Sequence, residues 1–219
     1  MSKKNRTSTE LQNSIDYDFI TRRNELRICK DIVEKNKNNI EGKVFAKNLI
    51  ITLYAHWEGF IKYSSECYLQ YLSHQNLKYS ELDYGLLAIS HIQKMKDFIE
   101  SNVALKVLAL KEIFSTLDDK ADIPYNYAVA TYSKLNTATL QEICLIIGID
   151  ENKYLLKKGI IDEKLVRVRN EIAHGNLKPI SLESIIETYD LVFPIMEEFK
   201  NDIQNSVATV KYKITRNAN

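Results

Sequence analysis

Residues 43–74 read KVFAKNLIITLYAHWEGFIKYSSECYLQYLSH and carry the clearest structural signal in the chain. Their apolar side chains, from Val44 to Leu72, recur at helical spacing around much of the helix circumference. A helix that is apolar on nearly all sides is buried in a core or covered in an interface. The sequence therefore predicts a long central or interfacial helix here.

Two amphipathic segments flank this helix in the sequence and predict two more long helices. The first covers residues 11–37 and carries many charges among its apolar positions, which predicts a solvent-facing helix. The second covers residues 182–206, where Pro194 predicts a kink or a split because proline lacks the N–H of a helical hydrogen bond.

Shorter helices are predicted between the long ones. Residues 92–117 contain one or two, and residues 137–147 form another that ends at Gly148. A further helix is led by Asp162 and ends at Gly175, because an acidic first residue and a glycine just past the last turn are typical helix boundaries.

The composition favours an all-α fold, a compact helical bundle in one domain. Six Gly and three Pro in 219 residues are too few breakers for a many-turned sandwich or barrel. We expect a disordered tail over 1–10, a helical domain over 11–206 and a C-terminal extension over 207–219, where alternating residues predict a short strand. Residues 118–136 are predicted to form a loop or an excursion from the bundle, and the sequence assigns them no function.

Charge and cysteine usage exclude several classes of protein. Thirty Lys and Arg balance 29 Asp and Glu, so any nucleic-acid site must be a local patch. Cys29, Cys67 and Cys144 are widely spaced, which argues against a disulfide framework or a zinc site. Residues 1–10 do not resemble a secretory signal, and no apolar stretch is long enough to span a membrane. We therefore expect a soluble cytoplasmic protein.

Residues 165–175 read LVRVRNEIAHG and carry the candidate chemistry. On a helix, Leu165, Val168 and Ile172 share one stripe that faces the core. Asn170 and His174 share another face because they are four residues apart. Arg169 points obliquely, and its long side chain can reach the same edge. The segment can thus anchor itself in the core and display polar groups.

The imidazole and the guanidinium suit reactions at a phosphodiester. His174 lies in the last helical turn before Gly175, where the helix dipole favours the imidazolium and raises the pKa of the ring. Arg169 offers a planar fork that binds phosphate oxygens and stabilises charge developing on phosphorus. Such a pair supplies what RNA transesterification needs without a metal. The simpler alternative is that both residues only complement the helix dipole.

Three segments resemble one family of proteins. Residues 169–175, RNEIAHG, resemble the Arg-x(4-6)-His signature of the HEPN superfamily (higher eukaryotes and prokaryotes nucleotide-binding), in many members of which Asn follows the Arg, as Asn170 does here. Residues 53–62, LYAHWEGFIK, and 22–27, RRNELR, are similar to segments of stand-alone bacterial HEPN-like nucleases. The resemblance covers residues from about 15 to about 199.

This resemblance implies a helical bundle that dimerises, so that two Arg-His motifs meet across a shared cleft. It implies RNA cleavage by the adjacent 2′-hydroxyl, with no cofactor and no metal, in a toxin or phage-defence component that an antitoxin or other regulatory protein restrains. By the same resemblance, Arg169 holds the scissile phosphate and Asn170 orients the pair. His174 either assists proton movement or positions the ribose.

Two polar residues stand within the apolar helix. His56 and Glu58 lie among aromatic and aliphatic neighbours, and burying them without partners would be costly. Either they support the edge of the active cleft, or they are a satisfied core histidine and an exposed carboxylate.

Basic and aromatic residues offer further contacts to RNA. Lys164, Arg167 and Lys178 flank the motif and can contact the RNA backbone, or they simply face solvent. The thirteen tyrosines can stack on unpaired bases, although tyrosines in apolar surroundings are core or interface residues.

Two other functions are compatible with the sequence. One is a non-catalytic HEPN module that binds nucleotide or RNA, or scaffolds a larger complex. The other is a purely structural helical dimer with Trp57 and Phe60 in its interface, in which residues 169–175 only cap a helix.

Overall fold

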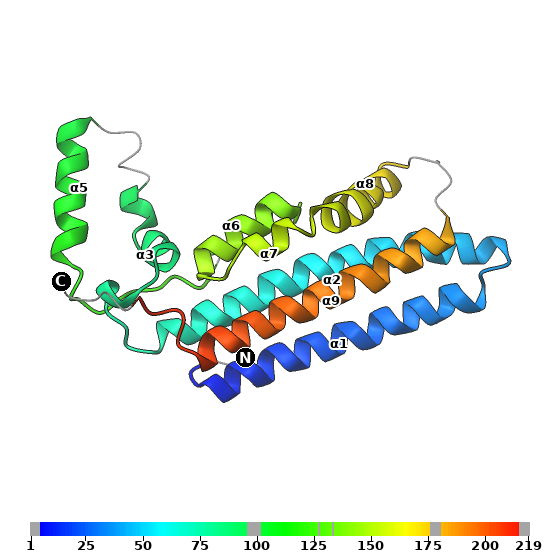
Figure 1. Cartoon of the computed structure of the whole chain (residues 1–219), viewed down its shortest axis with the longest axis horizontal. Coiled ribbons are helices and arrows are strands. Elements are labelled where there is room, and N and C mark those ends of the chain that lie inside the picture. Colours follow the sequence, from blue (N-terminus) through cyan, green and yellow to red (C-terminus); the bar gives the residue numbers. More distant parts are fainter. Residues whose placement is uncertain (1–4, 96–101, 127, 133, 176–180, 215–219) are drawn as a thin grey trace.

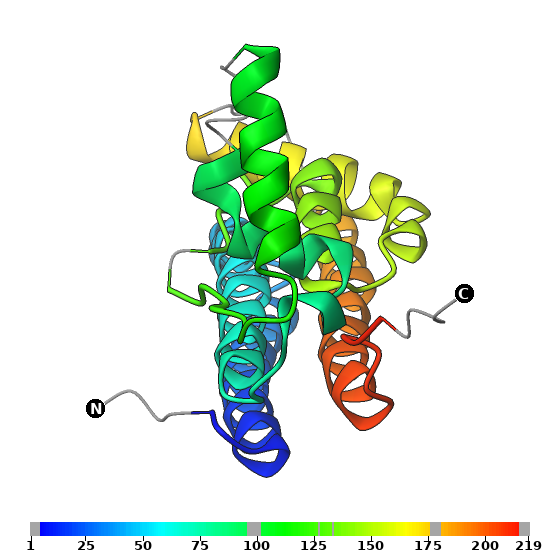
Figure 2. The same ribbon diagram turned by 90° about the vertical axis from the view of Figure 1, so that its left-hand side faces the viewer.

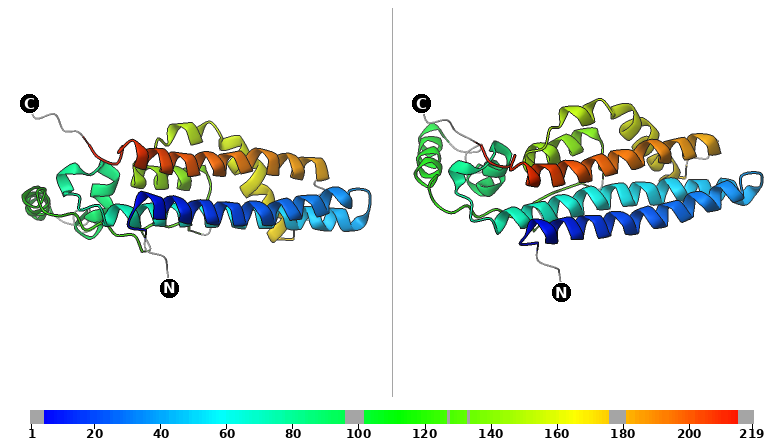
Figure 3. Two further views of the ribbon diagram at one scale, coloured as in Figure 1. Left: turned by 90° about the horizontal axis from the view of Figure 1, so that it is seen from below. Right: turned by 60° about the horizontal axis from the view of Figure 1, so that its bottom comes forward.

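The long apolar segment forms α2 (Ile40–Ser73), the helix around which the molecule is built. The computed structural model describes all residues except 1–4, 96–101, 127, 133, 176–180 and 215–219 (Figure 1). Helices α1 (Ser8–Lys35) and α9 (Leu182–Ala208) run alongside α2, and all three pack against one another (Figures 1 and 3). The predicted all-α class and the three long helices are confirmed.

Aromatic side chains join the three long helices. The Phe19 ring on α1 lies with its centroid 5.3 Å from that of Phe60 on α2 and 5.2 Å from that of Phe193 on α9. Trp57 and Phe60 are fully buried in this core. The alternative that these two residues form a dimer interface is therefore wrong, because the chain's own helices already cover them.

Four shorter elements form a second layer along α2 and α9 (Figure 1). They are α6 (Thr137–Ile147), α7 (Asn152–Leu155), the π-helical segment η2 (Gly159–Val166) and α8 (Arg167–Ala173). The boundary predicted at Gly148 is confirmed, since this residue ends α6 with a φ of 68°, a conformation that glycine adopts without strain.

The remaining elements lie together at one end of the long helices (Figure 2). They are η1 (Tyr79–Glu81), α3 (Tyr84–Ser90) and α5 (Val103–Ser115). Helix α3 packs so closely on α6 at Gly85 that a Cβ atom there would lie 1.8 Å from the Leu145 carbonyl oxygen. The contact therefore requires glycine at this position. Helix α5 projects from the body, and Ile113 is its one buried residue.

The predicted loop over residues 118–136 is also observed. In the parts of this connection that the structure describes there is neither helix nor strand, apart from the isolated bridge between Lys78 and Lys120. The connection runs from the end that carries α5 back to the start of α6 (Figure 1).

The prediction of a disordered tail over residues 1–10 is wrong for residues 5–10. Asn5 is 2% exposed, and its backbone N–H and Nδ2 each donate to Gln70 Oε1 at 3.0 Å. Thr7 and Glu10 form a capping box, so that α1 begins at Ser8. Polar side chains thus order this segment by hydrogen bonding, which an argument from apolar content alone overlooks.

The short strand predicted within residues 207–215 is also wrong. Helix α9 continues to Ala208, and up to residue 214 the extension makes only an isolated bridge between Leu82 and Lys213. The apolar Tyr212 packs edge-on against Tyr71, so the alternating pattern reflects docking on a helix.

Pro194 does not split the last helix. Helix α9 runs continuously through this position, and Pro194 lies on its exposed side. The backbone carbonyl four residues earlier loses its helical N–H partner at the proline, but it belongs to an exposed residue and can be hydrated. All three cysteines are free. Within the described part of the chain, no helix combines the length and the apolar character needed to cross a membrane.

Candidate active site beside helix α8

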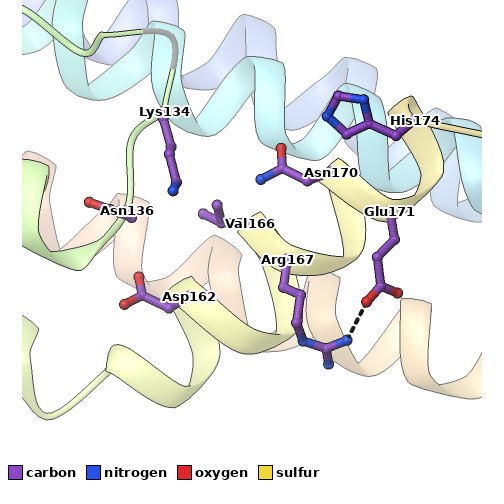
Figure 4. Close-up of a pocket in the computed structure, with 8 residues that line it drawn as sticks. All are labelled: Lys134, Asn136, Asp162, Val166, Arg167, Asn170, Glu171 and His174. Atoms are coloured by element: carbon purple, nitrogen blue, oxygen red, sulfur yellow. Dashed lines mark hydrogen bonds and ion pairs between the residues drawn. The ribbon is translucent and has the colours of Figure 1, made fainter. Parts of the chain in front are cut away.

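An open cavity of about 520 Å³ lies between α8 and the connection that precedes α6 (Figure 4). We call it the α8 cleft. Its walls are formed by Lys134, Asn136, Asp162, Val166, Arg167, Asn170, Glu171 and His174. In Figure 4, Asn170 and His174 extend from the side of α8 that faces Lys134. Two residues of the predicted motif are therefore brought together at this cavity.

Two side chains of α2 hold the wall opposite α8. Tyr54 Oη accepts a hydrogen bond from the Leu135 backbone N–H at 2.8 Å, and Trp57 Nε1 donates to the Leu135 carbonyl oxygen at 3.1 Å. Leu135 itself is buried, whereas the neighbouring Lys134 and Asn136 line the cleft. The two hydrogen bonds thus set the position of both lining residues.

The Asp162 carboxylate of η2, which lines the cleft, is hydrogen-bonded to the first residue of α6. Asp162 Oδ1 accepts from the Thr137 backbone N–H at 2.8 Å and from the Thr137 hydroxyl at 2.9 Å. Asp162 was predicted to lead its own helix, and this is a correction: the helical turns begin at Gly159, and Asp162 caps the first turn of α6 instead. The π-helical geometry of η2 continues directly into α8, and such turns often occur at functional sites.

Arg169 lies beside the cleft lining and is held from two sides. Its guanidinium carbon lies 4.3 Å from the centroid of the Tyr54 ring, within the range of a cation–π contact. Its Nη1 donates to Asn170 Oδ1 at 2.9 Å. Asn170 therefore joins Arg169 to the lining of the α8 cleft, and His174 follows at the C-terminal end of the same helix.

The cationic groups at the cleft differ in their ion pairs. Arg167 is paired on the exposed side of α8 with Glu163 at 3.0 Å and with Glu171 at 2.9 Å. No carboxylate ion pair is found for Arg169 or Lys134 among the residues that the structure describes. Within the described residues, the charges of Arg169 and Lys134 are therefore not engaged in ion pairs and can interact with an anion at the cleft.

The other predicted RNA-binding residues are placed as follows. Lys164 is paired with Glu187 of α9 at 2.6 Å. Exposed ion pairs contribute only about 0–1 kcal/mol, so Lys164 and Arg167 can exchange their partners for phosphate at little cost. Lys178 lies outside the described residues.

His56 and Glu58 are separated by the structure. His56 faces α1, where its Nδ1 lies 3.3 Å from Arg22 Nη1 and its Nε2 lies 3.3 Å from Glu25 Oε2. Burial lowers the pKa of His56, which favours the neutral ring. This placement does not support its predicted role at the cleft, since its partners belong to the α1–α2 contact.

Glu58 lies near the Tyr54 hydroxyl, whereas His56 faces α1. Burial raises the pKa of the Tyr54 hydroxyl, and the Glu58 carboxylate raises it further, whereas the Leu135 N–H and Arg169 oppose this shift. Glu58 therefore acts on the Tyr54 hydroxyl, apart from the contacts that His56 makes with α1.

Sequence reasoning missed several residues of this site. The sequence places Tyr54 and Trp57 in the family-like segment but does not predict their contacts with Leu135, and it does not predict Lys134 or Asn136 as site residues. The contacts with Leu135 could have been suspected from the polar groups of Tyr54 and Trp57, because a buried hydroxyl or indole N–H needs a hydrogen-bond partner.

No metal-binding arrangement stands out near these residues. Across the described ranges, no group of three or more His, Cys, Asp or Glu side chains is placed to hold a metal ion.

The comparison with known protein families gives one match. A family model described as RiboL-PSP-HEPN matches residues 17–205, which includes all of α2 and the motif on α8. No curated protein and no solved structure matches the chain significantly.

Tyr54 and Trp57 hold both backbone groups of Leu135, an arrangement that we call the Leu135 clamp. Replacing Tyr54 by Phe keeps the ring under Arg169 but leaves a buried N–H without its acceptor, so the free energy of unfolding should fall by about 1–3 kcal/mol. Urea denaturation followed by circular dichroism measures the change. Tyr84→Phe, at an exposed tyrosine of α3, is the control and should stay within about 0.5 kcal/mol of the unmodified protein. A Tyr54→Phe protein as stable as the control would contradict the clamp.

Proposed function

Because the chain belongs to the RiboL-PSP-HEPN family, we propose that it is a metal-independent endoribonuclease whose catalytic residues are Arg169, Asn170 and His174. HEPN domains are nucleases or nucleotide-binding modules, and the motif on α8 favours the first of these two. The observation that carries the proposal is the hydrogen bond from Arg169 to Asn170, on the helix whose last turn presents His174 to the same open cleft.

The proposed reaction is an attack by the ribose 2′-oxygen on the adjacent phosphorus. The bond from the 2′-oxygen to phosphorus forms, the bond from phosphorus to the 5′-oxygen breaks, and the products are a 2′,3′-cyclic phosphate and a 5′-hydroxyl. The proton lost by the 2′-hydroxyl and the proton gained by the 5′-oxygen both need a carrier, and His174 is suited to one of these transfers. Arg169 offsets the charge that grows on the phosphate oxygens.

The supporting residues act through Arg169. The Tyr54 ring and the Asn170 amide restrict its guanidinium to one region of the cleft edge. A guanidinium held in advance stabilises developing charge without reorganising during the reaction. Lys134 supplies a second positive charge on the opposite wall, where it can bind a neighbouring phosphate.

The main test is RNA cleavage by the purified chain in the presence of a chelator. We expect cleavage of a labelled RNA, no cleavage of its 2′-O-methyl analogue, and products with cyclic-phosphate ends. Arg169→Ala and His174→Ala should each lower the rate by about 100-fold or more, as loss of a charge-stabilising group or a proton carrier does.

Matched variants separate the site from general charge effects. Arg23→Ala removes an exposed arginine of α1 and should leave the rate unchanged. Arg169→Lys keeps the charge and loses the planar fork, so it should restore only part of the rate. Cleavage that persists in both alanine variants would rule out this site. Binding of RNA without any cleavage would favour the alternative, a non-catalytic HEPN module.

We also propose a homodimer in which the two motifs face each other. One Arg-His pair is a sparse catalytic set, and a twofold copy adds a second pair to the same cleft. Sedimentation equilibrium together with the cleavage assay should show that activity follows the dimer fraction as the protein is diluted. A monomer that cleaves RNA at the full rate would contradict the shared cleft.

The biological role is proposed from the family resemblance. We place the chain among toxins or phage-defence components that an antitoxin or other regulatory protein restrains. Induced expression of the unmodified chain in bacteria should arrest growth, and expression of Arg169→Ala should not. Equal growth of the two cultures would remove the toxin role while leaving the enzyme intact.

A further inference from the structure

A second cavity, of about 370 Å³, lies on the α1–α2 surface and takes no part in the proposed cleavage. We call it the tyrosine pocket. Its lining includes Tyr17 of α1, Tyr63, Glu66 and Gln70 of α2, and Tyr125 of the connection before α6. Three tyrosine rings thus line the pocket together with one carboxylate and the amides of Asn5, Gln70 and Asn126.

The amide of Gln70 is oriented by the segment that precedes α1. Gln70 Oε1 accepts from both the backbone N–H and the Nδ2 of Asn5, each at 3.0 Å. Asn5 is in turn held by the Ser14 hydroxyl, which donates to its Oδ1 at 2.7 Å. Because the oxygen of the Gln70 amide faces Asn5, its Nε2 group remains as a donor toward a ligand.

Glu66 lies one helical turn before Gln70, so the two side chains share one face of α2. Burial raises the pKa of Glu66, and the positive charge of Lys62, one turn earlier on α2, opposes this shift. Among the residues that the structure describes, Glu66 forms neither an ion pair nor a side-chain hydrogen bond. The pocket therefore presents an acceptor and a donor side by side, both uncommitted.

We infer that the tyrosine pocket binds a guanine base by its Watson–Crick edge, with Glu66 and Gln70 as the reading groups and Tyr17 and Tyr63 as stacking surfaces. Guanine offers two adjacent donors, the N1–H and the N2 amino group, followed by the O6 acceptor. A carboxylate matches the two donors, and the Gln70 Nε2 group matches O6.

The other bases match this arrangement less well. Adenine and cytosine place a ring-nitrogen acceptor where guanine has its N1–H, and cytosine and uracil place the O2 acceptor where guanine has its N2 amino group. A carboxylate repels each of these acceptors. An organic cation would suit Glu66 and the rings, but the Nε2 donor would face positive charge. Aromatic stacking on tyrosine is the usual way in which proteins hold single-stranded bases.

The pocket can serve the cleft because one chain segment lines both. Tyr125 lines the tyrosine pocket, and Lys134 and Asn136 of the same connection line the α8 cleft. On α2, Glu66 lies twelve residues beyond Tyr54, or about 18 Å along the helix axis at 1.5 Å per residue. A single-stranded RNA can span such a distance. That the guanine belongs to a substrate RNA rests on the proposed ribonuclease function; binding of the base itself does not.

Calorimetric titration of the full chain with GMP, IMP, AMP and agmatine tests the base pocket. We expect GMP to bind at least about tenfold more tightly than AMP, with IMP, which lacks the N2 amino group, in between. Glu66→Gln should abolish this preference, whereas Glu197→Gln, at an exposed glutamate of α9, should retain it. Equal binding of GMP and AMP, or binding of agmatine alone, would overturn the inference.

The stacking surface is tested at Tyr17, which is 74% exposed and contributes little to the core. Tyr17→Leu should weaken GMP binding by about tenfold, and Tyr17→Phe should not, because a phenyl ring still stacks. Tyr84→Leu changes a tyrosine that is 71% exposed on α3 and should have no effect. GMP binding that is unaffected by Tyr17→Leu would overturn the stacking role.

Two uncleavable 2′-O-methyl RNAs that differ by one G-to-A replacement distinguish RNA from free nucleotide. Tighter binding of the G-containing RNA supports a substrate subsite. A preference for GMP without any preference between the RNAs overturns the subsite and leaves a nucleotide site. If GMP binds and no RNA is cut, the proposed ribonuclease function fails while the guanine pocket stands.

Discussion

Both main-chain groups of Leu135 are hydrogen-bonded by α2, and the candidate site depends on this contact. The Tyr54 hydroxyl accepts from the N–H, and the Trp57 indole donates to the carbonyl oxygen. Because both rings are rigid and buried, the loop before α6 is held at one distance from the core helix. The Tyr54 ring also carries the Arg169 guanidinium. One tyrosine thus fixes the opposite wall of the cleft and the candidate phosphate-binding arginine.

This arrangement gives the YAHWEG segment of α2 a physical meaning. Its two buried aromatic rings clamp the loop, its Glu58 lies near the Tyr54 hydroxyl, and His56 joins α2 to α1 through Arg22 and Glu25. Gly59 leaves room for the Arg22 side chain, since a methyl group there would lie 2.7 Å from Arg22 Nη1. The segment therefore serves both the core and the cleft.

The sequence predicted the parts of the fold that depend on apolar periodicity. The three long helices and the end of α6 at Gly148 follow from patterns that are local in the sequence, and so does the placement of Asn170 and His174 on one face of α8. The contacts of Asn5, Asp162 and Leu135 could not be predicted, because each joins residues 9 to 81 positions apart through polar atoms. Periodicity shows which face is buried, but not which distant hydrogen bond completes it.

The central claim is that Arg169 and His174 act together on one phosphodiester in the α8 cleft. A crystal structure of the chain bound to a 2′-O-methyl RNA tests this most directly. The account predicts one phosphate group within hydrogen-bonding distance of both the Arg169 guanidinium and the His174 ring, from the same subunit or across a twofold axis. A phosphate backbone bound elsewhere, with these two side chains contacting only protein atoms, would contradict it.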